Sequence, residues 1–552
     1  MKWLLKIGAP YFTGWGLAKY VILGILSGLF GFLFISSVTS VIGMIIAGNF
    51  TTISKEYILI FISIILLFVW IRRTLSLAIV KLSQTLFWNL RKHILSLVLN
   101  ANYQQLSGRK PQIRTAVLND IYALTDTSLN IIQFTTSAIL ALSCLVYLFT
   151  ISWVLFLITL FIALVGVAVY HLSARSTQDQ FKRSRDLENG FQESLGSILD
   201  GFKEIYIEPK KGKFIYDHNI RNIADKSYAN NMAAFTGFIN NQITGQVLFY
   251  VLISAVLLFF SLFLNIKPGD TVSFIFTLLY LLSSIETIMV LLPGIARAKV
   301  AADHLSDLTK ELAEADFNSR IPSKYITRDE FEQLTVQDLE YHYVGEDNPF
   351  AIGPINFELR KGEIVFIYGG NGSGKTTFLH SVLGLRIPSS GGIMLNDALV
   401  TADNYTYYKT LFSVVFSDFY LFHELVGIDS PDMEKWDYYI RLFELEGKVT
   451  IENNRLSTTD LSAGQRKRLA LIAALMEDKP VLVMDEWAAD QDPYFRKKFY
   501  TQVLPILKKE GITIIAITHD DKYYSCADKL YKMDYGKLIP ESIDVYEPYT
   551  LS

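Results

Sequence analysis

The sequence predicts two fold classes in one chain, an α-helical membrane-spanning half followed by an α/β half. Its 552 residues are enough for several domains. Apolar stretches of roughly 20 residues recur as far as Pro293. Beyond them, short β-branched runs are typical of buried strands, and one such run is followed by a glycine-rich loop and a helical pattern. We expect domains at 1–317 and 330–552, joined by a linker at 318–329.

About six apolar stretches are long enough to cross the roughly 30 Å of hydrocarbon as helices. The third and fourth are almost continuous, so the turn near Ser152 must be very short. The expected spans are 20–46, 57–80, 131–149, 153–170, 247–266 and 271–292.

Basic residues indicate the orientation of these spans, because Lys and Arg accumulate in cytoplasmic loops. They are concentrated between spans two and three and between spans four and five, as at Arg91, Lys110, Arg183 and Lys211. We therefore expect a multi-pass protein of the cytoplasmic membrane with both termini and the α/β half in the cytoplasm. Residues 1–7 predict a short interfacial helix rather than a secretory leader.

The two basic segments are each long enough for a pair of helical extensions, and 82–99 has apolar residues at helical intervals. The prediction is that the spans continue as helices into the cytoplasm. Their turns, near 107–111 and 208–211, would then contact the α/β half. The alternative is a pair of solvated basic loops.

Cysteine and charge content exclude several classes. Cys144 and Cys526 are the only cysteines, which leaves no disulfide framework and no zinc site. The formal net charge of −3 gives no sign of nucleic-acid binding, and the basic residues are accounted for by membrane topology.

The run Gly369-Gly-Asn-Gly-Ser-Gly-Lys-Thr376 fits the phosphate-binding pattern G-x-x-x-x-G-K-[ST] between a strand pattern and a helix pattern. Glycines let backbone amides approach phosphates closely. Lys375 and the helix N-terminus supply positive charge, and Thr376 supplies a hydroxyl for Mg²⁺. This half is therefore predicted to bind a nucleotide with Mg²⁺.

Two acids, Asp485 and Glu486, end a second buried-strand pattern about 110 residues later. We predict that Asp485 is a partner of the metal and that Glu486 is the base beside an attacking water. A third apolar run, 512–519, ends in His519. Between the loop and the acids lies Leu461-Ser-Ala-Gly-Gln465, followed by a basic helix start.

With these motifs in this order, the chain resembles the ATP-binding cassette family over the whole α/β half and in its six-span, exporter-type layout. The resemblance implies that 461–465 is the signature motif, which contacts ATP held by the other subunit, so the chain would act as a homodimer. It also implies that His519 is the switch histidine at the γ-phosphate. Tyr343, preferred over Tyr341, would stack on adenine.

The resemblance thus assigns a full set of site residues. Catalysis falls to Glu486, His519 and Lys375, and Mg²⁺ binding to Thr376 and Asp485. The ATP contacts are Tyr343, Gly369, Asn371, Gly372, Ser373, Gly374, Lys375, Thr376, Thr377, Ser462, Ala463, Gly464, Gln465 and Asp492.

The chain departs from the family pattern at two places. Ser417 stands where the family has a glutamine that touches Mg²⁺, so either Ser417, a water or Asp418 fills this position, or hydrolysis is slow. After Glu486 the chain reads Trp-Ala-Ala-Asp-Gln-Asp492. These departures resemble the subgroup that exports cyclic or nonribosomal peptides and peptide siderophores, of the syringomycin- and pyoverdine-exporter type.

The cargo site is expected within the spans. Glu286 is an acid in the middle of the sixth span, where a carboxylate is costly unless it faces water or a partner. It either lines a cargo cavity, together with Gln246, Tyr250 and Tyr280, or pairs structurally with a neighbouring helix. A lipid or multidrug exporter, an importer built on the same fold, and a membrane-anchored ATPase that acts as a sensor or assembly factor remain alternatives.

Overall fold

The computed structural model describes residues 14–46, 55–260, 263, 266–313, 322, 324–343 and 350–543. It divides into two compact units, one of Met1–Val98 with Gly108–Glu314, the other of Leu99–Ser107 with Ala315–Ser552. The helix expected at 1–7 and part of the linker expected at 318–329 lie outside the described residues.

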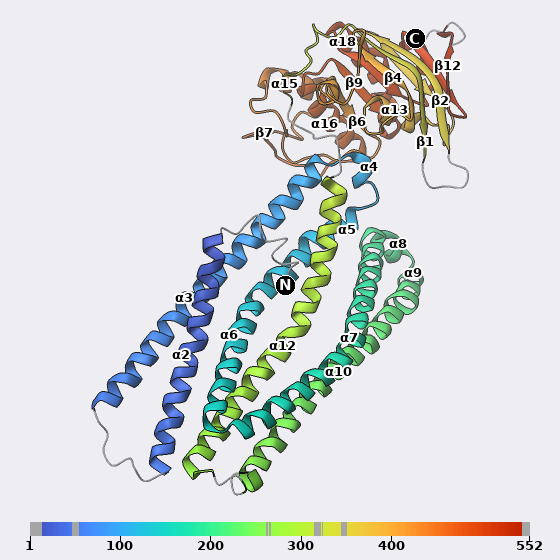
Figure 1. Ribbon diagram of the computed structural model, residues 1–552. Coiled ribbons are helices and arrows are strands. Elements are labelled where there is room, and N and C mark those ends of the chain that lie inside the picture. Colours follow the sequence, from blue (N-terminus) through green and yellow to red (C-terminus); the bar gives the residue numbers. More distant parts are fainter. Residues whose placement is uncertain are drawn as a thin grey trace. The chain divides into compact units, whose positions relative to one another are not determined.

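The first unit is built from long helices (Figure 1). The short turn predicted near Ser152 is confirmed, because one helix ends at Ile151, the next begins at Trp153, and the Ser152 hydroxyl accepts a hydrogen bond from the Leu155 amide. The long helices are α2 (Gly14–Ile46), α3 (Lys55–Asn100), α6 (Ile121–Ile151), α7 (Trp153–Asp200), α10 (Arg221–Ala255) and α12 (Pro268–Ala313).

Helices α3 and α7 run without a break far past the spans predicted at 57–80 and 153–170 (Figure 1). The continuation of these spans as helices is therefore observed, while their place in the cytoplasm stays a prediction. Short helices connect them to the next long helix: α5 (Lys110–Thr115) follows α3, and α8 (Phe202–Ile207) and α9 (Pro209–Phe214) follow α7.

Among the described residues, 5 helices are long and apolar enough to cross a membrane. They include Ile22–Ile46, Gln133–Ile151 and Pro268–Leu312. The fourth expected span falls in α7, whose described apolar part, Trp153–Gly166, is shorter than the rest. Several apolar helices are therefore observed, while the count of six stays a prediction.

The helices of the first unit pack through apolar side chains. A buried cluster that includes Cys144, Leu155, Phe249 and Leu278 joins α6, α7, α10 and α12. Gly28 permits the close approach of α2 to α6, because a Cβ atom there would lie 2.6 Å from Ile139 Cγ2. Small residues at such contacts are typical of helices that pack in membranes.

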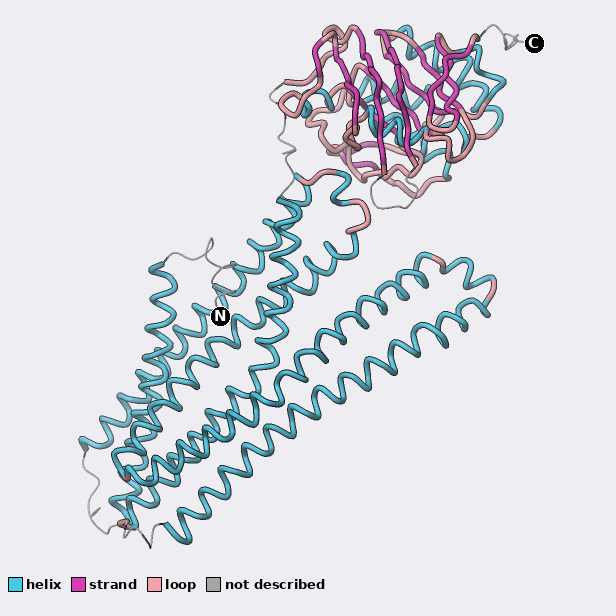
Figure 2. Tube along the Cα trace, turned by 45° about the vertical axis from the view of Figure 1, so that its right-hand side comes forward, coloured by secondary structure: helices cyan, strands magenta, loops and turns pink. Residues whose placement is uncertain are grey.

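The second unit contains a sheet of six strands in the order β12-β11-β3-β10-β9-β6 (Figure 2). All neighbours are parallel except β11 and β12. Both β9 and β10 are buried at every residue, as expected for parallel strands with both faces covered. The strands are β3 (Ile364–Tyr368), β6 (Phe412–Val415), β9 (Val481–Asp485), β10 (Thr513–Ile517), β11 (Lys529–Asp534) and β12 (Lys537–Glu541).

The strands β7 (Ile451–Glu452) and β8 (Arg455–Leu456) form a sheet of their own. A further, antiparallel sheet has the order β2-β1-β4-β5. Its strands are β1 (Gln333–His342), β2 (Ala351–Arg360), β4 (Ser390–Leu395) and β5 (Ala398–Leu399). The helices of this unit are α4 (Tyr103–Leu106), α13 (Lys375–Val382), α14 (Tyr405–Lys409), α15 (Met433–Leu442), α16 (Ala463–Met476), α17 (Pro493–Lys498) and α18 (Leu504–Lys509).

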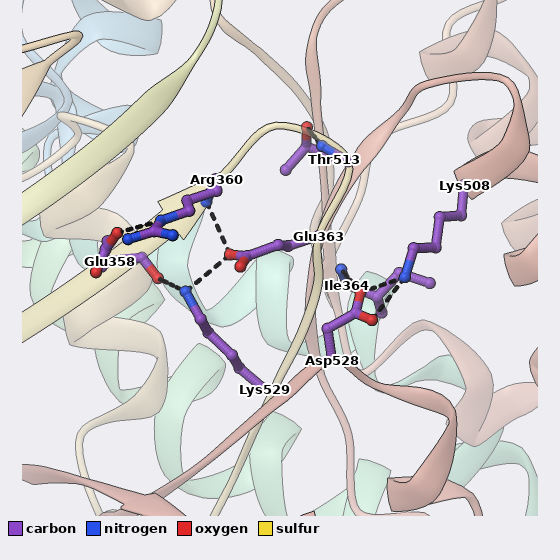
Figure 3. Close-up of polar contacts among 9 residues, drawn as sticks. Glu358, Arg360, Glu363, Ile364, Lys508, Thr513, Asp528 and Lys529 are labelled. Atoms are coloured by element: carbon purple, nitrogen blue, oxygen red, sulfur yellow. Dashed lines mark hydrogen bonds and ion pairs between the residues drawn. The ribbon is translucent and has the colours of Figure 1, made fainter.

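Polar contacts fix the start of β3, the strand that leads to the glycine-rich loop (Figure 3). The Ile364 amide donates to Asp528 Oδ2 at 2.8 Å, and Lys508 pairs with the same carboxylate at 2.6 Å. Lys529 Nζ lies 2.9 Å from Glu363 Oε2. Because these contacts fix the first residues of β3, they also fix the position of the glycine-rich loop that follows its last residue.

Candidate functional site

The glycine-rich loop, Gly369 to Gly374, connects β3 to the N-terminus of α13. Gly374 has a φ of 111°, and a Cβ atom at Gly369 would lie 2.2 Å from the Met533 carbonyl oxygen. A side chain at either position would be strained or would clash. The loop therefore needs glycine, and it presents backbone amides at a helix N-terminus, where phosphate binds readily.

Lys375 folds back over this loop, where its Nζ donates to the carbonyl oxygens of Gly369 at 2.9 Å and Gly370 at 3.0 Å. Burial lowers the pKa of the Lys375 ammonium, while the carboxylates of Glu486 and Asp485 oppose this shift. The Ser373 hydroxyl is buried without a hydrogen-bond partner. An unpaired buried hydroxyl and a movable ammonium fit a phosphate group that would bind both.

Asp485 and Glu486 lie at the carboxyl end of β9, and Asp485 pairs in register with Ile517 at the end of β10. Burial, and then the neighbouring Glu486 charge, raise the pKa of the Asp485 carboxyl. The Ser417 hydroxyl donates to Asp485 Oδ2 at 3.2 Å. Ser417, predicted as an uncertain metal ligand, is thus bound to the residue predicted to hold the metal.

No group of three or more His, Cys, Asp or Glu side chains in the described part of the chain is arranged to hold a metal ion. A hydroxyl and one carboxylate, from Thr376 and Asp485, are nevertheless the donors that Mg²⁺ uses when phosphate oxygens and water complete its shell.

The side chains of Glu486 and His519 meet beside Asp485. Glu486 Oε1 lies 3.1 Å from His519 Nε2, and both side chains are partly open to solvent, at 37% and 47% exposure. A carboxylate and an imidazole in contact at an open edge can orient a water and move a proton. The structure therefore brings together two of the three residues predicted for catalysis.

Tyr500, which the sequence did not single out, contacts the side chains on both sides of His519. Its hydroxyl lies 2.6 Å from Thr518 Oγ1 and donates to Asp520 Oδ2 at 2.9 Å, so it binds the residues on both sides of the histidine. Burial raises the pKa of Tyr500. Sequence offers little signal for such a residue, because it lies on a helix with no motif.

The predicted signature motif forms the start of α16. Ser462 caps the helix, and its hydroxyl and the Gln465 side chain make reciprocal bonds with each other's backbone amide. Ser462 and Ala463 are exposed, and Gly464 and Gln465 are half-buried. A helix N-terminus exposed in this way can bind an anion brought by another molecule.

Asp492, predicted as an ATP contact, has structural partners within its own chain. Its carboxylate accepts from Arg468 at 2.8 Å and from the Phe495 amide at 2.9 Å, the second bond capping α17. These bonds lower the pKa of Asp492.

Tyr343, predicted to stack on adenine, lies directly over the start of α13. Its hydroxyl is 3.1 Å from Thr377 Oγ1, and the Arg386 guanidinium lies 4.6 Å from its ring centroid. Tyr341 is buried at 8% exposure, which favours Tyr343 for contact with a ligand.

Helix α4 belongs by its contacts to the second unit. Gln104 donates to the Tyr341 hydroxyl at 3.2 Å, and the Tyr103 ring packs edge-on against His380 of α13, with centroids 5.5 Å apart. The segment just before the turn predicted at 107–111 therefore touches the helix that begins with Lys375.

In the membrane unit, Gln246 Nε2 donates to Glu286 Oε1 at 2.7 Å, so these two predicted cargo residues are brought together between α10 and α12. Tyr250 and Tyr280 are exposed at 54% and 38%. An apolar cavity of about 320 Å³ is lined by the chain neighbours of the pair, Gly245 and Ile285, and by residues such as Phe134, Ile162 and Met289.

Comparisons with known proteins agree with this architecture. Residues 352–489 match the family described as ABC transporter. The chain is 32% identical over 442 residues to the ATP-binding protein SyrD of Pseudomonas syringae pv. syringae, covering 78% of each chain. It is 34% identical over 228 residues to the energy-coupling factor transporter ATP-binding protein EcfA of Methanococcus maripaludis, covering 37% of this chain and 77% of that one.

Among solved structures, a bacterial Atm1-family ABC exporter with ATP bound superposes with a TM-score of 0.77 over 95% of both chains, at 13% identity, which shows a shared fold. The relation to SyrD extends well beyond the nucleotide-binding half. The chain therefore belongs to the ABC transporter family, as an exporter-type half-transporter that couples ATP hydrolysis to transport.

Proposed function

We propose that the chain exports a peptide-like cargo, such as a cyclic or nonribosomal peptide, a microcin-like peptide or a peptide siderophore, across the cytoplasmic membrane. The observation that carries this proposal is the 32% identity to SyrD over 78% of the chain, which includes membrane helices as well as the ATPase. The Ser417 and Trp487 departures from the family pattern support the same subgroup. Domains at 1–317 and 330–552, six spans and cytoplasmic termini are part of the proposal.

The geometry of the site supports the following roles for its residues in this proposal. Lys375, the loop amides and the Ser373 hydroxyl bind the phosphates of ATP, and Tyr343 contacts adenine. Glu486 orients the attacking water. His519 binds the Glu486 carboxylate and would also contact the γ-phosphate of ATP. Mg²⁺, held by Thr376 and Asp485, would supply charge neutralisation for phosphoryl transfer. Ser417, at the position of the family's glutamine, supports Asp485 through its hydrogen bond rather than binding the metal itself.

The chain works as a homodimer in this proposal. The exposed N-terminus of α16, with Ser462 and Gly464, would meet ATP held by the phosphate loop of the second copy. ATP then closes the dimer, and hydrolysis reopens it. Exposed apolar side chains in and beside α8 and α9, with Tyr206 at 76% and Ile207 at 81%, favour further contacts outside the chain.

Alternating access would link this cycle to transport if the cargo binds the two conformations with different affinity. The Gln246–Glu286 pair and the nearby apolar cavity support a site for a cargo that has both apolar and polar or cationic groups. Lipid or drug export is the alternative, since the apolar lining of the cavity also suits those cargoes.

The test is ATP hydrolysis by the full chain in lipid vesicles against a panel of cyclic peptides, siderophores, lipids and dyes, with Glu486→Gln as the inactive reference. Stimulation by a peptide class, absent in the reference, supports the proposal. Stimulation by lipids or dyes alone would replace it with the general exporter.

A further inference from the structure

Lys467 is a buried lysine one turn into α16, just after the signature motif. Its side chain is 5% exposed, and its ammonium lies 2.7 Å from Asp490 Oδ2 and 3.0 Å from the Glu486 carbonyl oxygen. A buried charge is tolerated only when it is paired and hydrogen-bonded. Both partners of this charge belong to the loop that carries the proposed catalytic base.

The backbone of Glu486 is held in an uncommon conformation. Its φ is 49°, in the left-handed region that a residue with a side chain rarely adopts. Such conformations persist when the surrounding structure fixes them, and they occur often at functional sites. Here the Glu486 amide donates to the Ile517 carbonyl at 3.1 Å, and the Glu486 carbonyl accepts from Lys467.

A second set of bonds joins the same helix to the same loop. The Trp487 indole donates to the Lys467 carbonyl at 2.8 Å, and the buried ring packs against Phe499. The Gln491 side-chain amide, through Nε2, donates to the Gly464 carbonyl at 3.1 Å. The start of α16 and the loop after β9 are therefore joined by several bonds, which run from the Glu486 carbonyl to the Gln491 side chain.

We propose that Lys467 is a positioning residue for hydrolysis, which fixes the Glu486 backbone so that its carboxylate faces His519. Glu486 acts on the ATP bound by the phosphate loop of its own chain. Ser462 and Gly464, at the start of α16, contact the ATP bound by the other copy, and Lys467 of the same helix binds the Glu486 backbone. The two ATP sites are thereby linked. This second part rests on the proposed homodimer.

The experiment compares ATP hydrolysis by the purified full chain in vesicles with that of Lys467→Met and Lys467→Arg. We expect Lys467→Met to lower kcat on the order of 100-fold, as a displaced catalytic group does. The KM for ATP should stay within about twofold, since the phosphate loop is untouched. Lys467→Arg, which keeps a charged donor but has a larger head group, should recover part of kcat.

Lys435→Met is the matched control. Lys435 lies on α15, away from the site, and its ammonium is also 2.7 Å from an aspartate, Asp478. This variant should keep the parental kcat. If Lys467→Met does not fold, Asp490→Asn removes only the exposed partner of the pair and should still lower kcat. A parental kcat in Lys467→Met overturns the proposal. So does an equal loss of kcat, ATP binding and thermal stability in Lys467→Met and Asp490→Asn.

The link between sites has its own readout, the Hill coefficient for ATP, which should exceed 1 in the parent and fall toward 1 in Lys467→Met. A parental coefficient of 1 would overturn the link. Light scattering of the same purified chain in detergent, before it is placed in vesicles, separates the two proposals. A monomeric mass for the active parent would overturn the homodimer and the link, whereas the kcat comparison tests the positioning of Glu486 alone.

Discussion

Asp485 shows at the scale of one residue how function and stability conflict. Its folded-state pKa is raised by burial, so between the unfolded and folded pKa values the folded chain binds more protons, and stability falls as pH rises. At neutral pH the ionised carboxylate is therefore destabilising until a cation binds. We predict that Asp485→Asn raises the melting temperature of the nucleotide-free protein while lowering ATP hydrolysis at least about 100-fold, or about 2.7 kcal/mol.

Differential scanning fluorimetry and an ATPase assay measure both effects on one preparation. The exposed Asp429→Asn is the control and should change neither value. A lower melting temperature in Asp485→Asn would contradict the account of this carboxylate.

His380 gives a prediction of opposite pH sign. Burial, and then the nearby Arg386 charge, lower its pKa, while Asp418 opposes the shift. The unfolded chain therefore takes up a proton first as pH falls below about 6.5, and stability should decline there by at most about 1.4 kcal/mol per pH unit. Melting temperatures from pH 7.5 to 5.5 should fall less steeply in His380→Asn; parallel curves would refute this assignment.

At the scale of elements, Gly28 and Gly24 provide a matched pair on α2. A Cβ atom at Gly28 would lie 2.6 Å from Ile139 Cγ2 of α6, whereas one at Gly24 would meet nothing within 4 Å. Overpacking of this kind costs about 1–3 kcal/mol. We predict that Gly28→Ala lowers thermal stability in detergent and Gly24→Ala does not; equal effects would mean that α2 and α6 are not in close contact.

The sequence was most informative where a local pattern determines the element. Uninterrupted apolar runs located β3, β9 and β10, and the loop motif located Lys375 at the start of α13. The antiparallel sheet of β1, β2, β4 and β5 was not anticipated, because its pairing depends on contacts between segments distant in the chain.

The residues of the candidate site differ in the same way in how far the sequence predicts them. Motif residues such as Glu486 and His519 were located by the strands that precede them. Lys467 and Tyr500 were missed, because their roles depend on which loop lies across from them in space. Side-chain partners of this kind have no fixed sequence spacing, so only a structure can find them.

For the whole molecule, Glu286 allows a test of whether the membrane unit takes part in the choice of cargo. Glu286→Gln keeps an oxygen that can accept from Gln246 but removes the charge, whereas Glu286→Ala removes both. If the charge contacts cargo, both variants should raise the cargo concentration for half-maximal ATPase stimulation about 10-fold, or about 1.4 kcal/mol. If only the alanine variant changes it, the pair is structural.

The central claim is that ATP hydrolysis drives cargo out of the cytoplasm. Its most direct test is the uptake of a labelled cyclic peptide or peptide siderophore into inside-out membrane vesicles that contain the full chain. We expect accumulation that requires ATP and Mg²⁺ and is lost in Glu486→Gln. The contrary result is a chain that hydrolyses ATP and accumulates lipid or dye in these vesicles but accumulates no peptide cargo.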